Sequence, residues 1–127
     1  MSESQKFFFC RHCGNVAVLA VATAGVLSCC GEEMSELIPN TVDASREKHL
    51  PTVETTADGI KVNVGGVLHP MAEDHHIDFI YVKTERGGQR VKLEVGDSPE
   101  ATFRFADDKP TEVYAYCNLH GLWKTKI

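Results

Sequence analysis

The chain has 127 residues, 43% of them hydrophobic and 24% charged, and its formal net charge is -5 at pH 7. This length holds one domain of ordinary size, or a very small domain joined to one of about 90 residues. The negative charge and the absence of any basic run in the sequence argue against nucleic acid as a partner.

The five cysteines fall into two groups. Cys10, Cys13, Cys29 and Cys30 lie in the first quarter of the chain, and Cys117 stands alone near its end. An odd number grouped in this way suits metal thiolates better than a disulfide framework. The alternative is a vicinal disulfide between Cys29 and Cys30, which reduced cytosol disfavours.

The first cysteine pair, Cys10 and Cys13, is separated by two residues and followed by Gly14. Two cysteines at this spacing can bind one ion from a single turn, and the glycine tolerates the positive φ that such turns need. Cys29 and Cys30 supply a second pair, in which adjacent residues must both bend toward the ion. Four thiolates favour iron or zinc, and the sequence does not choose between them.

The segment between the two pairs is apolar. We expect Val16 to Thr23 to form one or two strands of a minute domain that the metal holds together, because so short a segment buries too little core alone. Val16 to Leu27, with Lys6 and Arg11 before it and Cys29 after it, also has the pattern of a bacterial lipoprotein signal. That alternative leaves the other cysteines of the region without a role, and the run is too short to span a bilayer. We therefore interpret these cysteines as a metal site. We expect a cytoplasmic protein that does not associate with a membrane.

The composition changes after an acidic piece at Glu32 to Leu37, where Pro39 interrupts any helix. We place the domain boundary there, which gives domains of residues 1–38 and 39–127. Early in the second domain, Ser45 to Pro51 is a charged segment that by itself predicts a solvated loop.

Beyond this segment the pattern changes to short strands. Ile60 to Val64 alternates apolar and polar residues and ends at Gly65-Gly66, as a half-buried strand before a turn does. A hairpin is predicted around Gly87-Gly88. Short strands without a long helix indicate a mainly β protein whose larger domain is an antiparallel sandwich. The strands predicted after the first are Ile77–Lys83, Gln89–Val95, Ala101–Phe105, Glu112–Cys117 and Leu122–Lys126.

A second candidate metal site lies in this domain. Cys117 and His120 are three residues apart at the end of an apolar strand, so both can turn onto one ion from a tight loop. Taken singly, a buried cysteine and a lone histidine are usually structural. Together with upstream histidines they predict a metal site, because loops on a sandwich hold ligands at the ends of rigid strands. The upstream candidates are His49, His69, His75 and His76.

These motifs together resemble the desulfoferrodoxin family, the two-iron superoxide reductases, over nearly the whole chain. The resemblance implies a desulforedoxin-like, rubredoxin-like domain in residues 1–38 and a neelaredoxin-like, immunoglobulin-like sandwich in residues 39–127. The motifs that carry it are Cys10-x-x-Cys13, Cys29-Cys30, Glu47-Lys48-His49, His69-Pro70-Met71, His75 and Cys117-Asn118-Leu119-His120-Gly121-Leu122-Trp123.

The same resemblance implies two iron ions per chain, with zinc as a second possibility at the first site. His76 has no ligand role in the family's pattern. The implied ligands of the first iron are Cys10, Cys13, Cys29 and Cys30. Those of the second are His49, His69, His75 and His120 in a plane, with Cys117 as the axial ligand.

The implied activity is that of an oxidoreductase: one-electron reduction of superoxide to hydrogen peroxide at a ferrous ion with an open sixth position, a detoxification reaction in oxidative stress. Lys48 is expected to attract the anionic substrate and to order the water that supplies a proton. Glu47 is expected to occupy the sixth position of ferric iron after the product leaves. The resemblance also implies electron transport from a small donor such as rubredoxin, and a homodimer, which exposed Phe7 to Phe9 favour as well.

Two alternatives come from other classes of protein. A cupredoxin-like electron carrier also has a β-sandwich with a late Cys…His loop, but it uses a methionine after the histidine, and no methionine follows Met71. A structural zinc protein explains the N-terminal thiolates but leaves Lys48, His49 and Cys117 without a role.

Overall fold

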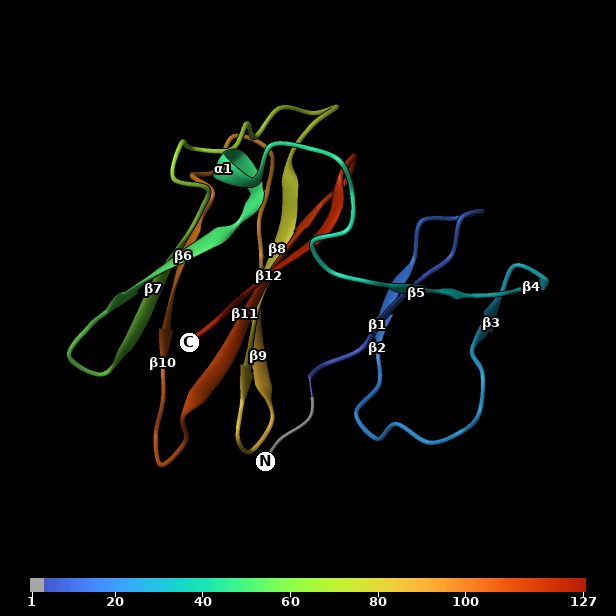
Figure 1. The fold of residues 1–127 in the computed structure, drawn as a ribbon, viewed down its shortest axis with the longest axis horizontal. Helices are drawn as coiled ribbons and strands as arrows, with labels where there is room; N and C mark the ends of the chain where they lie inside the picture. Colours follow the sequence, from blue (N-terminus) through green and yellow to red (C-terminus); the bar gives the residue numbers. More distant parts are fainter. Residues whose placement is uncertain (1–3) are drawn as a thin grey trace. The chain divides into compact units, whose positions relative to one another are not determined.

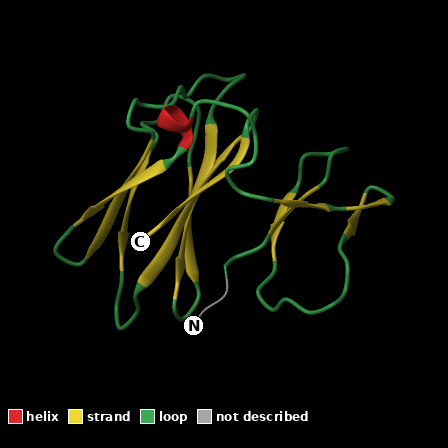
Figure 2. Cartoon of the chain, viewed as in Figure 1, coloured by secondary structure: helices red, strands yellow, loops and turns green. Residues whose placement is uncertain are grey.

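The computed structural model describes residues 4–127, which form two compact units. The boundary along the chain lies between Ile38 and Pro39. Figures 1 and 2 show that nearly all regular structure is β, and every strand pairing is antiparallel. The one helix in the described part of the chain is α1 (Arg46–His49). The prediction of a mainly β, antiparallel protein is therefore confirmed.

The N-terminal unit contains five short strands. Three of them form a sheet in the order β2-β1-β5, and the other two form a separate hairpin. Phe7 is fully buried, and Phe8 and Phe9 are partly buried, so the expectation of an exposed Phe7 to Phe9 is wrong. The strands are β1 (Phe7–Phe9), β2 (Val16–Val18), β3 (Ser28–Cys29), β4 (Glu32–Glu33) and β5 (Ser35–Leu37).

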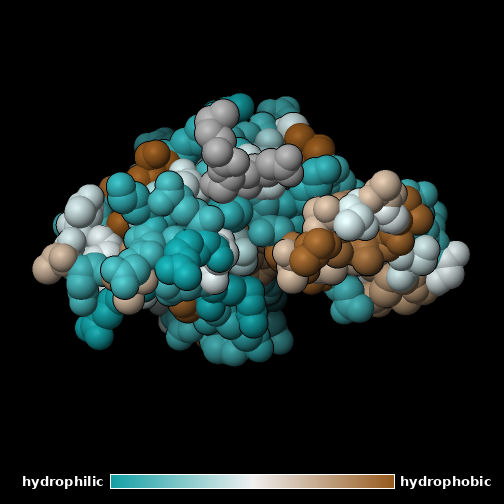
Figure 3. Space-filling model, turned by 90° about the horizontal axis from the view of Figure 1, so that it is seen from below, coloured by the Kyte–Doolittle hydropathy of each residue, from teal (hydrophilic) through white to brown (hydrophobic). Residues whose placement is uncertain are grey.

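Apolar side chains are exposed elsewhere in this unit. Only Val16–Val18 of the predicted strand region pairs, because β1 offers just three residues to pair with. The chain that follows, up to the second cysteine pair, runs as a loop in which Val21 and Val26 are 78% and 71% exposed. Figure 3 shows apolar surface over this unit. The prediction of strand as far as Thr23 is thus wrong from Leu19 onward.

The C-terminal unit contains seven strands in two sheets. One sheet has the order β10-β7-β6 and the other β12-β11-β8-β9. The first sheet comprises β6 (Pro51–Thr55), β7 (Gly59–Val64) and β10 (Glu100–Arg104). The second comprises β8 (Ile77–Thr84), β9 (Gly88–Lys92), β11 (Pro110–Cys117) and β12 (Gly121–Lys126).

The core lies between these two sheets. Every second residue of β7 is buried, as its alternating sequence predicts, and these side chains belong to one cluster with those of the opposite sheet. The cluster consists of Ile60, Val62, Val64, Ile77, Ile80, Val82, Leu93, Ala101, Phe103, Val113, Ala115 and Cys117. A cysteine therefore sits at the end of an otherwise apolar core.

Two elements of this unit differ from the prediction. Ser45 to Pro51 is not simply a loop, because α1 occupies its middle and ends in the buried His49. Strand β6 was not predicted, since it is an edge strand whose only apolar residues are the buried Pro51 and the partly buried Val53, while its other residues face solvent. The hairpin around Gly87-Gly88 is confirmed, although β9 ends at Lys92.

Loops gather at the two ends of the sandwich. Strand β11 ends at Cys117, and its partners β8 and β12 begin beside that end, since they run antiparallel to it. Helix α1 and the loop between β7 and β8 lie at this same end, away from the turn between β8 and β9 (Figure 1). Residues distant in sequence are thereby brought together at one end of a rigid scaffold.

The core makes a simple prediction about stability. Val82 is fully buried, whereas Val95 is 51% exposed. We expect Val82→Ala to lower the free energy of unfolding by about 2–3 kcal/mol, because it removes buried methyl groups and leaves a cavity. Val95→Ala, the same chemical change at the surface, should alter it by less than about 0.5 kcal/mol. Urea unfolding followed by fluorescence of the single tryptophan, Trp123, measures both, and equal losses would contradict this account of the core.

Candidate metal centres

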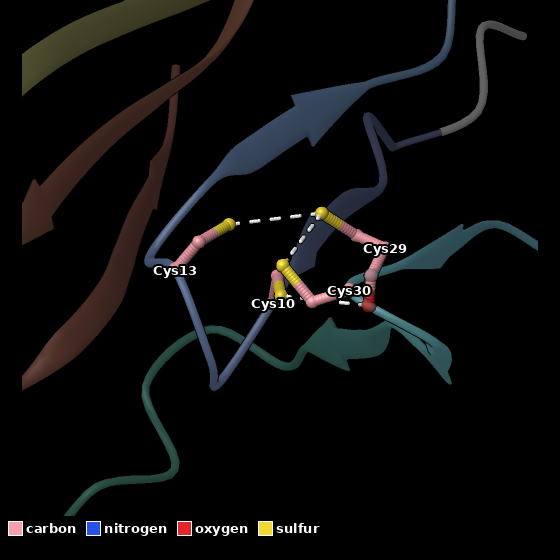
Figure 4. A group of neighbouring side chains, drawn as sticks. All are labelled: Cys10, Cys13, Cys29 and Cys30. Atoms are coloured by element: carbon pink, nitrogen blue, oxygen red, sulfur yellow. Dashed lines mark hydrogen bonds between the residues drawn. The ribbon is translucent and has the colours of Figure 1, made fainter.

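The four N-terminal cysteines converge in one cluster (Figure 4). Their sulfur atoms all lie within 4.8 Å of one another, with Cys13 Sγ 3.6 Å from Cys29 Sγ and Cys29 Sγ 3.9 Å from Cys30 Sγ. None of the five cysteines is in a disulfide, so the vicinal disulfide is not formed. The set of four converging sulfurs is one that could hold a tetrahedral ion.

Two turns bring these sulfurs together. In the first, Gly14 N–H donates to the Cys10 carbonyl at 2.8 Å, and Cys10 N–H donates to the Asn15 carbonyl at 2.9 Å. In the second, between β3 and β4, Cys30 and Gly31 both adopt positive φ, of 54° and 77°. This left-handed backbone is what lets adjacent cysteines bend toward the same point, at the cost of a strained conformation for Cys30.

The thiols of this cluster are not equivalent. The pKa of Cys10 is lowered to about 6, chiefly because the backbone N–H of Cys13 donates to its sulfur. The pKa of Cys30 is raised to about 12, chiefly by hydrogen bonding with Cys13 and then with Cys29 and Cys10. The lowered pKa of Cys10 favours its thiolate, whereas the raised pKa of Cys30 favours its thiol until a cation replaces the proton.

A second cluster forms at the loop end of the sandwich. Helix α1 supplies His49, the loop between β7 and β8 supplies His69 and His75, and the end of β11 supplies Cys117. One ligand atom from each of these four side chains lies within 4.8 Å of the others. His120 adjoins the set, with its Nδ1 3.0 Å from His49 Nε2 and 3.9 Å from Cys117 Sγ.

The four imidazoles form a ring of neighbours. Successive ring centroids around the order His49, His69, His75, His120 are 4.6, 4.6 and 5.0 Å apart, and the ring closes with 4.8 Å between His120 and His49. Neighbouring rings are close to perpendicular, at 72° to 89°. Across the ring, His49 and His75 are 6.2 Å apart and inclined by only 32°. Four side chains disposed around one centre in this way could bind an ion in their midst.

The hydrogen bonds of the imidazoles indicate which nitrogen faces that centre. His49 Nδ1 lies 2.6 Å from the Ser45 carbonyl and His69 Nδ1 lies 2.7 Å from the Pro70 carbonyl, so each Nδ1 carries the proton and donates. The Nε2 atoms of His69 and His75 are buried and have no hydrogen-bond partner among the described residues. Buried nitrogen lone pairs without partners are costly, and a metal ion would satisfy them. The residues present therefore fit a metal ion.

Burial favours the neutral form of His49, His69 and His75. It lowers the pKa of His49 and His75, and lowers that of His69 to about 4. The charge of Lys48 makes a smaller contribution in the same direction at His49 and His75. A neutral imidazole offers a lone pair, so protons do not compete for the nitrogens of these three histidines near neutral pH.

Cys117 is placed by an irregularity of the sheet. Between Tyr116 and Cys117 the register of β11 against β8 shifts, so that Cys117 pairs with Ile77 and Asp78 is skipped. The sulfur is fully buried, and burial raises the pKa of the thiol. The backbone N–H groups of His120 and Leu119 both donate to it, which partly offsets that rise.

Two supporting residues were part of the C-terminal motif, but no role was predicted for them. Trp123 is stacked on His49, with centroids 5.0 Å apart, and its Nε1 donates to the His120 carbonyl at 3.1 Å. Asn118 accepts the His76 N–H at 2.8 Å and donates to the Asp74 carbonyl at 3.1 Å, which ties the β11–β12 turn to the loop that carries His75. In the sequence, the position of the polar Asn118 between the candidate ligands Cys117 and His120 was the signal that could have indicated its supporting role.

The remaining predicted residues lie around the cluster. Glu47 and Lys48 are exposed on α1, immediately before the buried His49. His76 stands outside the ring of imidazoles, with its Nε2 2.9 Å from the Asp78 carboxylate and its Nδ1 3.0 Å from the Ala72 carbonyl. Met71 Sδ accepts the Ile77 N–H at 3.3 Å, so it serves the backbone and does not supply the axial thioether of a copper site.

The fold and these two clusters define a β protein with a four-thiolate metal site and a separate histidine–cysteine metal site. Comparison with known proteins gives this class a name. Family models for desulfoferrodoxin and for the desulfoferrodoxin N-terminal domain match residues 41–126 and 2–37. The chain belongs to the desulfoferrodoxin family.

Individual relatives agree with this assignment over the full length. The chain is 45% identical to the desulfoferrodoxin of Syntrophotalea carbinolica and 42% identical to that of Nitratidesulfovibrio vulgaris, covering 99% of both chains in each case. Its fold matches the crystal structure of the superoxide reductase from Treponema pallidum with a TM-score of 0.83 and 36% identity, over 98% of this chain and all of the other. The cupredoxin-like alternative is not supported.

The lowered pKa of His69 leads to a pH prediction for the metal-free protein. Unfolded, His69 binds a proton below its ordinary pKa of 6.5; folded, it does so only near 4. The unfolded chain thus holds more protons between these values, so stability is fully present above about pH 6.5 and falls as pH drops toward 4. Urea unfolding at about pH 7.5 and about pH 5 measures this fall. His69→Gln, which cannot titrate, should show a smaller fall, and an equal one would assign the effect to other groups.

Proposed function

We propose that this chain is a superoxide reductase, which adds one electron and two protons to superoxide and releases hydrogen peroxide. The observation that carries the proposal is the ring of four imidazoles, two of them buried and two half-buried, with the buried Cys117 sulfur beside it. Two nitrogens of these imidazoles have no partner in the described residues. The likeness to the superoxide reductase of Treponema pallidum supports it.

Iron is the proposed metal at both sites, with zinc as a second possibility at the N-terminal one. A ferrous ion in the histidine–cysteine site supplies one electron per superoxide. The proposed ligands of this ion are His49, His69 and His75 through Nε2, His120 through Nδ1, and Cys117 through its sulfur. Those of the N-terminal ion are Cys10, Cys13, Cys29 and Cys30.

The chain's own groups prepare the site for this reaction. Burial of the Cys117 sulfur with two N–H donors fixes its orientation and tunes how strongly it donates electron density. The indole of Trp123 is stacked on the imidazole of His49 and shields that face of the imidazole from water. Glu47, exposed on α1, is the proposed carboxylate that would bind the ferric ion once the product has left.

Lys48 is proposed to serve the substrate. Superoxide is an anion and the protein carries a net charge of -5, so a local positive charge is needed to raise the encounter rate. The Lys48 charge acts on both His49 and His75, which supports its lying close to the ring of imidazoles. The same ammonium group can hold the water that supplies a proton to the product.

The stoichiometry of the reaction tests the proposed function. We expect the iron-loaded, anaerobically reduced protein to form about one hydrogen peroxide per superoxide consumed, because each chain gives up one electron without regaining it. Stopped-flow mixing with a superoxide pulse, followed by a peroxide assay, measures the ratio. About one peroxide per two superoxides, with oxygen released, would instead indicate a dismutase. Cys117→Ser is the matched variant and should lose the thiolate-to-iron absorption together with the reaction.

The role of Lys48 can be tested separately. We expect Lys48→Ala to slow the bimolecular reaction with superoxide by roughly ten-fold at low ionic strength, and by much less at high salt, because it removes a steering charge that salt would screen. Lys109→Ala is the control, since it changes net charge equally but lies just before β11, whose far end carries Cys117. Equal effects of the two variants would show that net charge, and not the position of Lys48, governs the rate.

A small electron donor such as rubredoxin is the proposed partner, which would make the chain part of an electron-transport chain. Exposed apolar side chains lie next to the candidate ligands: Leu68 precedes His69 and is 64% exposed, and Leu119 precedes His120 and is 59% exposed. Apolar side chains beside a redox site suit a transient protein contact. The donor would dock at the same end of the sandwich as the substrate enters.

The remaining proposals concern organisation and location. We assign residues 1–38 to a desulforedoxin-like domain and 39–127 to a neelaredoxin-like, immunoglobulin-like domain. A homodimer is proposed, in which Val21 and Val26 would be covered, since large exposed apolar side chains favour association. The cytoplasm is the proposed location, because free cysteines persist in a reducing compartment. No helix among residues 4–127 is long and apolar enough to cross a membrane.

A further inference from the structure

We propose that Gly65 is a positioning residue for the reaction: it fixes the backbone of Glu47 and Lys48, so that their exposed side chains act from a rigid base. The proposal rests on the proposed function, because it concerns the two residues assigned there to substrate and product. Gly65 lies in the first turn after β7, far from α1 in sequence, and it is itself buried.

Three backbone hydrogen bonds join this turn to the segment that carries Lys48. Gly65 N–H donates to the Leu50 carbonyl at 2.9 Å, and Gly66 N–H donates to the Glu47 carbonyl at 2.7 Å. Val67 N–H reaches the same Glu47 carbonyl at 3.4 Å. The bonds bracket Lys48 on both sides, so the backbone of this residue cannot shift without breaking them.

Only glycine fits at the centre of this contact. An ideal Cβ on Gly65 would lie 2.6 Å from the carbonyl oxygen of Lys48 and closer still to that of Val67. Both atoms belong to the backbone, so neither can rotate away as a side chain would. The φ angle of Gly65 is +87°, which residues with a Cβ rarely adopt. A side chain here would therefore push the Lys48 backbone outward.

The arrangement separates a fixed backbone from mobile side chains. Glu47 and Lys48 are exposed, whereas His49, the next residue, is buried and hydrogen-bonded to Ser45. Holding the peptide between Glu47 and Lys48 fixes the point from which the Lys48 side chain extends. This limits how far its ammonium group can lie from the ring of imidazoles. Any approach of Glu47 to the site then comes from rotation of its side chain.

The neighbouring glycine provides a matched control. A Cβ on Gly66 would meet nothing nearer than the Glu47 carbonyl oxygen at 3.9 Å, and the φ angle of Gly66 is not in the left-handed region. Gly65→Ala and Gly66→Ala are thus the same chemical change one residue apart. Gly65→Asn separates the two causes, because asparagine tolerates positive φ but still carries the clashing Cβ.

The test compares these variants in the iron-loaded protein with and without Lys48→Ala. We expect Gly65→Ala to slow the reaction with superoxide at low ionic strength by most of the roughly ten-fold expected for Lys48→Ala, and to flatten its salt dependence. In the Gly65→Ala background, Lys48→Ala should then add little, whereas in the Gly66→Ala background it should have its full effect. Gly65→Asn should behave as Gly65→Ala. Additive losses, or equal rates for Gly65→Ala and Gly66→Ala, would overturn the proposal.

The visible spectrum distinguishes positioning of Lys48 from damage to the metal site. The thiolate-to-iron absorption should be the same in Gly65→Ala and the unmodified protein. A changed absorption would mean that the substitution acts through His49, and the assignment of Gly65 to Lys48 would fail.

Amide hydrogen exchange tests the contact in the unmodified, iron-loaded chain, even where a variant does not fold. The amides of Gly65 and Gly66 should exchange much more slowly than that of Gly25, which lies in the exposed N-terminal loop. Equally fast exchange would show that the contact does not hold in solution, whether or not the protein reacts with superoxide. Slow exchange in a protein that does not reduce superoxide would instead reject the proposed function and keep the contact.

Discussion

The structure depends on gathering four imidazoles and one thiol at the end of an apolar core, where every buried polar atom needs a partner. Two of the rings meet this demand by donating Nδ1 to nearby carbonyls of Ser45 and Pro70, which leaves their Nε2 atoms to face inward. Other hydrogen bonds join the segments: Gly65 and Gly66 donate to the carbonyls of Leu50 and Glu47, and Asn118 ties the last turn to the loop that carries His75. The metal site is consequently a property of three loops held to one sandwich, and no single segment of the chain contains it.

Both clusters bring several potential metal ligands together, but their surroundings differ. In the N-terminal unit Cys13 and Cys30 are exposed, and the sulfurs are held by two tight turns with very little core behind them. In the C-terminal unit Cys117 is fully buried at the end of a packed core. Loss of metal should therefore affect the fold of the first unit far more than that of the second, because only the second has a hydrophobic core of its own.

The sequence predicted what depends on local pattern and on residue chemistry. The alternation of Ile60 to Val64 and the glycines at 87 and 88 were enough for β7 and for one hairpin, and the candidate ligands could be named from their positions at strand ends. Strand β6 escaped prediction because its two inward residues are Pro51 and Val53, and a proline followed by a single apolar residue gives too short an alternation to indicate a strand. The supports of the site, such as the stacking of Trp123 on His49, depend on tertiary contacts that no local pattern encodes.

The shift in register between β8 and β11 has a consequence for how this sheet can vary. Because side chains alternate along a strand, skipping Asp78 turns Ile77 toward the core and keeps a carboxylate, 45% exposed, on the other side. Insertion or deletion of one residue between His75 and Phe79 would exchange the two faces of this stretch and disturb the packing of Ile77 beside Cys117. Length in this short stretch is therefore constrained as tightly as the identity of any ligand, and variation among relatives is expected in side chains there but not in spacing.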